Sequence, residues 1–83
     1  MPIEIYTLSY CPYCAAAKRF FDERGMKYTE YQLDGNEDEE FRKLQKKFNI
    51  QNEVTVPQII VNGKRIGGYT DMMALLEEGK LKF

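Results

Sequence analysis

The two cysteines, Cys11 and Cys14, are the only thiols of the chain, and two residues separate them. An apolar run (residues 3–8) precedes the pair, and a run with helical spacing (residues 12–24) follows it. A C-x-x-C pair at a strand-to-helix junction is typical of a thiol–disulfide redox site. The first N–H groups of a helix lack internal partners and carry partial positive charge, which favours a thiolate there. We therefore predict that Cys11 is the nucleophile and that Cys14, one turn into the helix, is the resolving thiol.

Two other uses of the cysteine pair have less support. A structural metal site needs about four ligands, and the chain has no other cysteine and no histidine, so only a site shared across a dimer remains. A structural disulfide that closes so short a loop would restrain little of the unfolded chain. We therefore expect redox chemistry and no metal site within one chain.

Length and charge narrow the class of protein. A chain of 83 residues is expected to form a single domain, residues 1–83, whose core needs no disulfide. Its formal net charge of −1 gives no sign of binding to nucleic acid or to a membrane surface. No apolar run approaches about 18 residues, and no charged-then-apolar leader opens the sequence. We expect a soluble, monomeric protein of the cytoplasm.

Strands and helices are predicted to alternate around the cysteine pair. Apolar patterning indicates strands and helical spacing indicates helices, in the order strand 3–8, helix 12–24, strand 27–33, helix 34–48, strand 59–61, strand 64–66 and helix 69–78. Asn62-Gly63 is a strong signal for a tight hairpin between the last two strands. Asn36 and Glu39 resemble a capping box at the start of the second helix. The order β-α-β-α-β-β-α begins with a parallel βαβ unit and describes an α/β protein.

Three motifs follow one another along the chain: Cys11-Pro12-Tyr13-Cys14, Thr55-Val56-Pro57-Gln58-Ile59 and Gly67-Gly68-Tyr69-Thr70-Asp71. Together, and on this pattern of elements, they resemble the dithiol glutaredoxins, and the resemblance covers essentially the whole chain. It implies a thioredoxin-like fold in which three helices flank a four-stranded mixed sheet. It also implies a cis peptide bond before Pro57, glutathione as co-substrate and no tightly bound cofactor.

The resemblance also implies a glutathione site. Its contacts would be Tyr13, Thr55, Val56, Pro57, Gly68, Thr70 and Asp71. The backbone of Val56 would pair with the cysteine of the ligand, as in strand addition. The free N–H groups at the start of the last helix would take the γ-glutamyl carboxylate, and Asp71 would take the ammonium group.

One position departs from the family pattern. Many glutaredoxins place Lys or Arg three residues before the first cysteine, where it meets the glycine carboxylate of glutathione. Leu8 occupies that position here. We expect Arg42, on the second predicted helix, to supply the missing cation, and we include it in the predicted glutathione site.

The predicted function is glutathione-dependent reduction of protein disulfides and of glutathione mixed disulfides. Cys11 would attack, and Cys14 or a second glutathione would resolve the intermediate. The expected partners are glutathione and disulfide-bonded or glutathionylated proteins. Two alternatives stay open. One is a redoxin that thioredoxin reductase reduces and that serves ribonucleotide reductase. The other is a carrier that holds an iron–sulfur cluster between two copies through Cys11 and two glutathiones.

Overall fold

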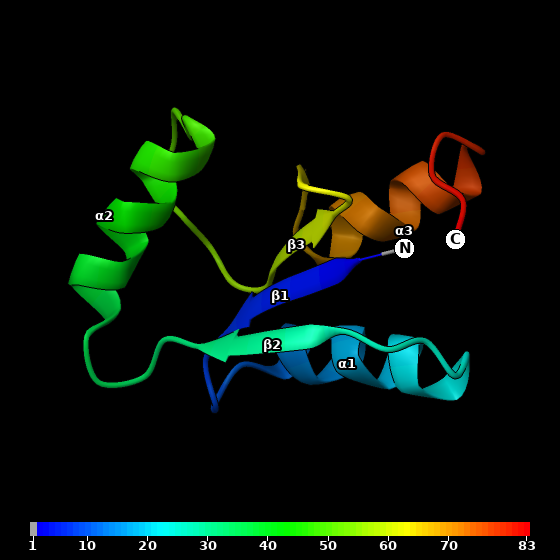
Figure 1. Ribbon diagram of the computed structural model, residues 1–83, viewed down its shortest axis with the longest axis horizontal. Coiled ribbons are helices and arrows are strands. Elements are labelled where there is room, and N and C mark those ends of the chain that lie inside the picture. Colours follow the sequence, from blue (N-terminus) through cyan, green and yellow to red (C-terminus); the bar gives the residue numbers. More distant parts are fainter. Residues whose placement is uncertain (1) are drawn as a thin grey trace.

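The computed structural model describes residues 2–83 and shows a four-stranded sheet with helices on both faces (Figure 1). The elements in chain order are β1 (Ile3–Thr7), α1 (Pro12–Glu23), β2 (Thr29–Gln32), α2 (Glu37–Phe48), β3 (Gln58–Val61), β4 (Lys64–Gly67) and α3 (Tyr69–Glu77). This order confirms the predicted sequence of strands and helices, with differences only at the element ends. No helix within residues 2–83 is long and apolar enough to cross a membrane.

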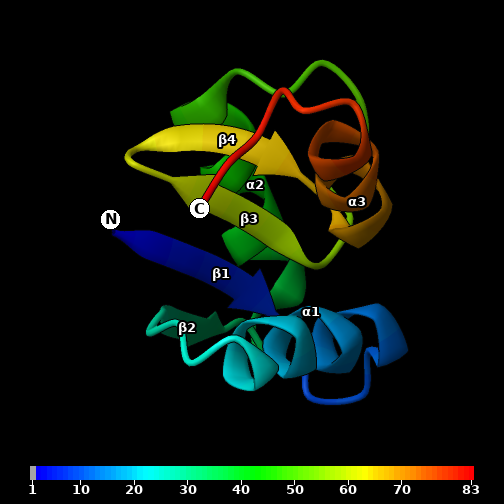
Figure 2. The same cartoon turned by 90° about the vertical axis from the view of Figure 1, so that its right-hand side faces the viewer.

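The strands lie side by side in the order β2-β1-β3-β4. β1 is parallel to β2 and antiparallel to β3, and β3 is antiparallel to β4. The residues after β1, before β3 and after β4 therefore lie at one end of the sheet (Figure 2). Tyr6 pairs with Gln58, and Ile59 pairs with Gly67, so this register brings the three sequence motifs together.

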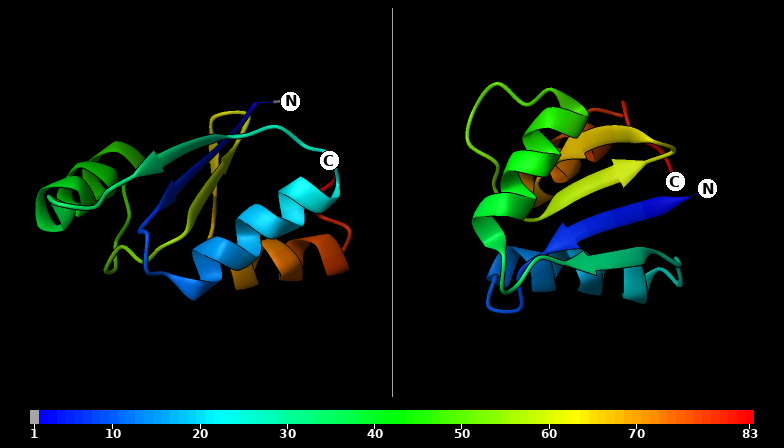
Figure 3. Two further views of the ribbon diagram at one scale, coloured as in Figure 1. Left: turned by 90° about the horizontal axis from the view of Figure 1, so that it is seen from below. Right: turned by 60° about the vertical axis from the view of Figure 1, so that its left-hand side comes forward.

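The main core lies between the sheet and the pair of helices α1 and α3. Alternate residues of β1 and β3 point to this face, since side chains along a strand alternate between the two sides. The buried members of this core are Ile3, Ile5, Ala17, Phe21, Ile59, Val61 and Met72. This core holds α1 and α3 against the same face of the sheet, as both views in Figure 3 show.

A smaller cluster lies on the opposite face of the sheet, beneath α2 (Figure 3). Its buried members are Leu8, Leu33, Leu44 and Val54. Half-buried side chains pack around them, and these are Tyr6, Cys11, Phe41, Phe48, Ile50 and Val56. The sulfur-bearing residue Cys11 therefore lies at the border of this second cluster.

Two local predictions have opposite outcomes. The hairpin between β3 and β4 is confirmed, with φ of 54° at Asn62 and 78° at Gly63, the left-handed values that this kind of turn requires. The capping box at the start of α2 is wrong, because the side chain of Asn36 makes no cap hydrogen bond. Asn36 has φ −138° and ψ 44°, away from the extended conformation that aims an N-cap side chain at the first turn. The acidic first turn of α2 still favours the positive end of the helix dipole.

Candidate active site

Cys11 occupies the N-cap position of α1, immediately before Pro12. Its Sγ accepts the backbone N–H of Cys14 at 3.2 Å. Pro12 fits the first helical position because the N–H that it lacks would have no partner inside the helix. The sulfur therefore lies where a helix N-terminus stabilises negative charge, as the sequence predicted.

Cys11 also contacts the second motif. Its thiol donates a weak hydrogen bond to the carbonyl oxygen of Val56 at 3.5 Å. The peptide bond between Val56 and Pro57 is cis, as the family resemblance implied. The side chain of Cys11 is half-buried, so its sulfur lies beside this backbone and remains open to solvent on one side.

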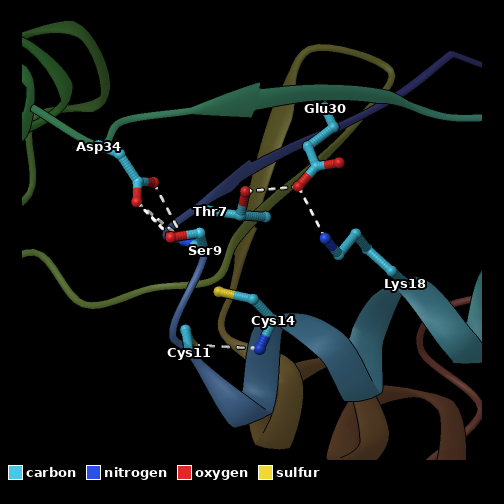
Figure 4. A network of polar contacts seen from close by, with 7 residues as sticks. All are labelled: Thr7, Ser9, Cys11, Cys14, Lys18, Glu30 and Asp34. Carbon is cyan, nitrogen blue, oxygen red and sulfur yellow. Dashed lines mark hydrogen bonds and ion pairs between the residues drawn. The ribbon is translucent and has the colours of Figure 1, made fainter.

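Cys14 has a different environment from Cys11. Cys14 is 1% exposed, and its side chain points from α1 toward Thr7 on β1, as Figure 4 shows. Burial raises the pKa of the Cys14 thiol to about 12, and the hydrogen bond with Cys11 adds to this effect. Cys14 is therefore protonated at neutral pH and out of reach of a large substrate, whereas Cys11 is accessible.

A cavity of about 340 Å³ opens beside the cis proline. It is lined by Tyr13, Thr55, Val56, Pro57, Gly68, Tyr69, Thr70 and Asp71. The structure thus brings together every predicted glutathione contact except Arg42. Tyr69 is an additional member that sequence reasoning assigned only to the start of the last helix. Its ring lies 6.3 Å from that of Tyr13, centre to centre, so the two aromatic rings form one wall of the cavity.

The start of α3 closes the other side of this cavity. An oxygen of the Asp71 carboxylate accepts the N–H of Gly68 at 2.9 Å. Gly67 has φ of +115°, and a Cβ added to it would lie 2.6 Å from that oxygen. A Cβ on Gly68 would lie 3.6 Å from the carbonyl oxygen of Pro57. Gly67 is therefore required for the close approach between β4 and α3, and Gly68 lies against the second motif.

A larger cavity, of about 590 Å³, lies at the opposite end of β1. Its lining includes Pro2, Ile3 and Gly63, and neither cysteine is part of it. We assign the active site to the smaller cavity because that cavity adjoins the thiol chemistry.

Arg42 and Leu8 lie apart from the predicted arrangement. Arg42 is exposed on α2 and lines a separate cavity of about 320 Å³, formed with residues 35–39. Its position gives no support to the prediction that it contacts glutathione. Leu8 is 7% exposed and packs with Leu33 and Leu44 beneath α2. An apolar contact in the second cluster thus replaces the cation that the family often carries there.

Two polar links, which sequence reasoning missed, attach the region of the cysteines to β2 and its following loop (Figure 4). In the first, the backbone N–H of Ser9 donates to Asp34 Oδ1 at 3.0 Å, and the Ser9 hydroxyl donates to Oδ2 of the same carboxylate. The hydrogen bond from the Ser9 side chain lowers the pKa of Asp34. This link fixes the segment just before Cys11.

The second link lies one turn beyond Cys14. The Thr7 hydroxyl donates to Glu30 Oε2 at 2.7 Å, and Lys18 Nζ donates to the same oxygen at 2.9 Å. The Thr7 hydrogen bond, followed by that from Lys18, lowers the pKa of Glu30. A signal for this link was present in the sequence. Thr7 is polar, although the alternation of β1 places it on the same side of the strand as the apolar Ile3 and Ile5.

The sequence is similar to those of known proteins. The Glutaredoxin family model matches residues 3–66. The chain is 40% identical over 81 residues to Glutaredoxin-C6 of Oryza sativa subsp. japonica. The matched region covers 96% of this chain and 70% of that protein. It is 37% identical over 79 residues to Glutaredoxin 3 of Escherichia coli strain K12, covering 95% of this chain and 90% of the relative.

Solved structures agree with the sequence comparison. Glutaredoxin 1 from Francisella tularensis, complexed with cacodylate, has a TM-score of 0.81 and 28% identity, and 93% of each chain is covered. The buckwheat glutaredoxin–glutathione complex has a TM-score of 0.79 and 32% identity, covering 96% of this chain and 72% of that one. The predicted thioredoxin-like fold is thereby confirmed. The chain belongs to the glutaredoxin family and is an enzyme of the glutathione-dependent disulfide oxidoreductase class.

Proposed function

We propose that Cys11 is the nucleophile and Cys14 the resolving thiol in the reduction of protein disulfides and glutathionylated proteins. The observation that carries the proposal is the contrast between the two thiols. Cys11 Sγ is half-buried and accepts an N–H at the start of α1, whereas Cys14 is 1% exposed. A substrate disulfide can therefore reach Cys11 but not Cys14.

The first step is attack by the Cys11 thiolate on the glutathione sulfur of a glutathionylated protein. A bond forms between Cys11 and glutathione while the bond between glutathione and the protein breaks. The protein leaves as a thiolate and takes a proton from water. The N–H of Cys14, at 3.2 Å from Cys11 Sγ, stabilises the attacking anion before the step.

The second step restores the enzyme by one of two routes. A second glutathione thiolate attacks the glutathione sulfur on Cys11, which releases oxidised glutathione and the Cys11 thiolate. With a protein disulfide as substrate, Cys14 instead attacks Cys11, which forms an intramolecular disulfide and releases the substrate thiol. Two glutathione molecules then reduce that disulfide. Removal of glutathione from a protein thus needs Cys11 alone, while reduction of a protein disulfide needs both cysteines.

The cavity beside the cis proline supports glutathione as the working thiol. The carbonyl oxygen of Val56 lies 3.5 Å from Cys11 Sγ. The backbone of Val56 is therefore in place to pair with the cysteine of the ligand. The N-terminus of α3 suits the γ-glutamyl carboxylate. Asp71 lines the same cavity and can accept the γ-glutamyl ammonium while it holds the N–H of Gly68, because a carboxylate accepts several hydrogen bonds.

The physiological partners follow from this chemistry. We propose that the chain acts as a monomer on disulfide-bonded and glutathionylated proteins, since Cys11 and the glutathione cavity belong to one chain. Reduced glutathione is the electron source, so we place the protein in the cytoplasm.

A coupled assay tests the proposal. Reduction of a small mixed disulfide is followed with glutathione and glutathione reductase, and in parallel with thioredoxin reductase alone. Activity is expected only in the first system, lost in Cys11→Ser and kept in Cys14→Ser. Activity that survives in Cys11→Ser would overturn the assignment of the nucleophile. Activity only with thioredoxin reductase would favour the redoxin alternative, and a coloured protein after anaerobic reconstitution with iron and sulfide would favour the cluster carrier.

A variant at Asp71 tests the glutathione cavity. Asp71→Asn removes the charge but keeps an oxygen that can accept the N–H of Gly68, so α3 retains its first turn. A charge-assisted bond contributes about 1.5–3 kcal/mol, so KM for glutathione should rise roughly tenfold or more. Unchanged KM would remove Asp71 from the proposed site.

A further inference from the structure

A partly buried ion pair lies one turn beyond the resolving thiol. Lys18 follows Cys14 by four residues on α1, so both side chains leave the same face of the helix. Figure 4 shows Lys18 reaching from that face toward Glu30 on β2. The Lys18 and Glu30 side chains are 28% and 27% exposed, and Thr7, which holds Glu30, is completely buried. Neither step of the proposed reaction uses this group of Lys18, Glu30 and Thr7.

The resolving step has a difficulty that this assembly can relieve. Cys14 must attack as a thiolate, but burial holds the pKa of Cys14 at about 12. In an unassisted site, only a very small fraction of Cys14 would be reactive at neutral pH. Some group near Cys14 must therefore favour its anion once Cys11 carries the substrate.

The charges around Cys14 change when Cys11 becomes a mixed disulfide. In the reduced enzyme, the hydrogen bond with Cys11 and the charge of Cys11 both raise the pKa of Cys14. Both effects disappear when Cys11 bonds to the substrate, because its sulfur is then neutral. The backbone at Leu8 and the charge of Lys18 lower the pKa of Cys14, and they remain.

The other groups on this side of the sheet do not replace Lys18. Glu30 on β2 forms an ion pair with Lys18 itself, and the charge of Tyr28, just before β2, also acts on Lys18. β1 contributes the neutral hydroxyl of Thr7, and β3 and α3 contribute apolar residues to the adjoining core. Lys18 is thus the cation that acts on Cys14 from its own helix.

We propose that Lys18, held by Glu30 and Thr7, is a positioning residue that brings positive charge to Cys14 and so accelerates the displacement of the substrate from Cys11. This inference rests on the proposed function, because it assumes that Cys14 resolves the mixed disulfide. In the step, a bond forms between Cys14 and Cys11 while the bond from Cys11 to the substrate sulfur breaks. The enzyme dithiol is oxidised, the substrate is reduced, and the proton from Cys14 ends on the departing thiolate.

The expected effect is moderate. If the pKa of a thiol falls by about one unit, about ten times more thiolate is present at a pH well below the pKa. Each thiolate is then about threefold less nucleophilic. The net gain in rate is therefore about threefold. Lys18 is the last of the influences on the pKa of Cys14 in order of size, so we expect its removal to slow the step by no more than about threefold.

A single-turnover experiment isolates this step without glutathione. The reduced protein is mixed with one equivalent of dithiobis(nitrobenzoic acid), and released thionitrobenzoate is followed by absorbance. Attack by Cys11 releases the first thionitrobenzoate, and attack by Cys14 on the resulting mixed disulfide releases the second. Lys18→Met should slow only the second release, by up to about threefold. The rate of that release, which rises with pH, should then rise at a higher pH than in the unchanged protein. Lys18→Arg should restore the rate.

Two controls separate this role from a structural one. In a Cys14→Ser background, Lys18→Met should leave the first release unchanged. Lys43→Met removes a lysine from an exposed pair on α2, on the other face of the sheet, and should change neither phase. Equal slowing of both phases by Lys18→Met, or no slowing of the second, would overturn the inference. If Lys18→Met slows the second release as expected but the unchanged protein is inactive in the glutathione-coupled assay, the proposed function alone is overturned.

Discussion

The two faces of the sheet differ in size and in what they do. The face covered by α1 and α3 carries the larger core, in which Ile5, Ala17, Phe21, Ile59 and Met72 are all 0% exposed. The face covered by α2 carries the smaller cluster of Leu8, Leu33, Leu44 and Val54, each between 4% and 8% exposed. The proposed resolving thiol, Cys14, is buried on the α1 side of the sheet, whereas Cys11 borders the smaller cluster.

This difference separates stability from reactivity. Buried apolar area stabilises in rough proportion to its size, so the α1 and α3 face contributes more to the free energy of folding. A reactive sulfur needs access to solvent and substrate, which the centre of a large core denies. Substitutions in the two clusters and at Cys14 can show whether the two faces have these separate roles.

The largest effect is expected for Phe21→Ala in the larger core. Removal of a completely buried phenylalanine costs about 3–5 kcal/mol in the free energy of unfolding, because packing is lost and a cavity remains. Denaturant unfolding measures the change. Phe20→Ala is the matched control, since Phe20 is the neighbouring and only half-buried ring on α1, and it should cost clearly less. Equal costs would contradict the assigned core.

A smaller effect is expected for Leu8→Lys in the second cluster. The family often carries a cation here, but Leu8 is 7% exposed and packs beneath α2. A lysine loses the apolar contact and must move its charge toward solvent, which should cost about 2–4 kcal/mol. Leu8→Met, which keeps an apolar side chain of similar volume, should cost less than about 1.5 kcal/mol. A stable Leu8→Lys variant with tighter glutathione binding would show that this position tolerates the family cation after all.

The buried thiol of Cys14 should make stability depend on pH. The pKa of Cys14 is raised to about 12 in the folded protein, compared with about 8.5 for a thiol in an unfolded chain. Between these values the unfolded chain loses the proton while the folded chain keeps it, so the stability of the reduced protein should fall as pH rises above about 8.5. The loss is at most about 1.4 kcal/mol per pH unit. Denaturant unfolding of Cys14→Ala should show a smaller slope, and equal slopes would argue against a buried, protonated Cys14.

The smallest effect is expected for the exposed ion pairs of α2. Lys43 lies 3.3 Å from Glu40 and 3.8 Å from Glu39, but its side chain is 63% exposed. Pairs of this kind on a helix surface contribute about 0.3–0.5 kcal/mol, and salt screens them. Lys43→Met should therefore leave the free energy of unfolding almost unchanged at moderate ionic strength. A cost above about 1 kcal/mol would show that these exposed pairs stabilise α2 more than surface ion pairs usually do.

The order of elements was predictable because its signals are local, and most of the site was predictable because three motifs resemble those of a known family. Alternation, helical spacing and the turn at Asn62-Gly63 predicted the order of elements, and the motifs predicted seven of the residues that line the cavity. Tyr69 was missed as a lining residue, since its ring acquires that role only by lying 6.3 Å from Tyr13, on another helix. The capping box at Asn36 was wrong because the same residues also permit a backbone in which the side chain makes no cap bond.

The residues alone indicated two redox thiols at the start of a helix, and their resemblance to a known family added the cis proline and the glutathione contacts. The packing of the folded chain set which residues surround the two thiols. It buried Leu8, placed Arg42 away from the cavity, and joined Thr7, Glu30 and Lys18 near Cys14. The physical reason is that periodicity and motif spacing act over one or two turns of chain, while these contacts depend on sheet register and helix packing between distant segments.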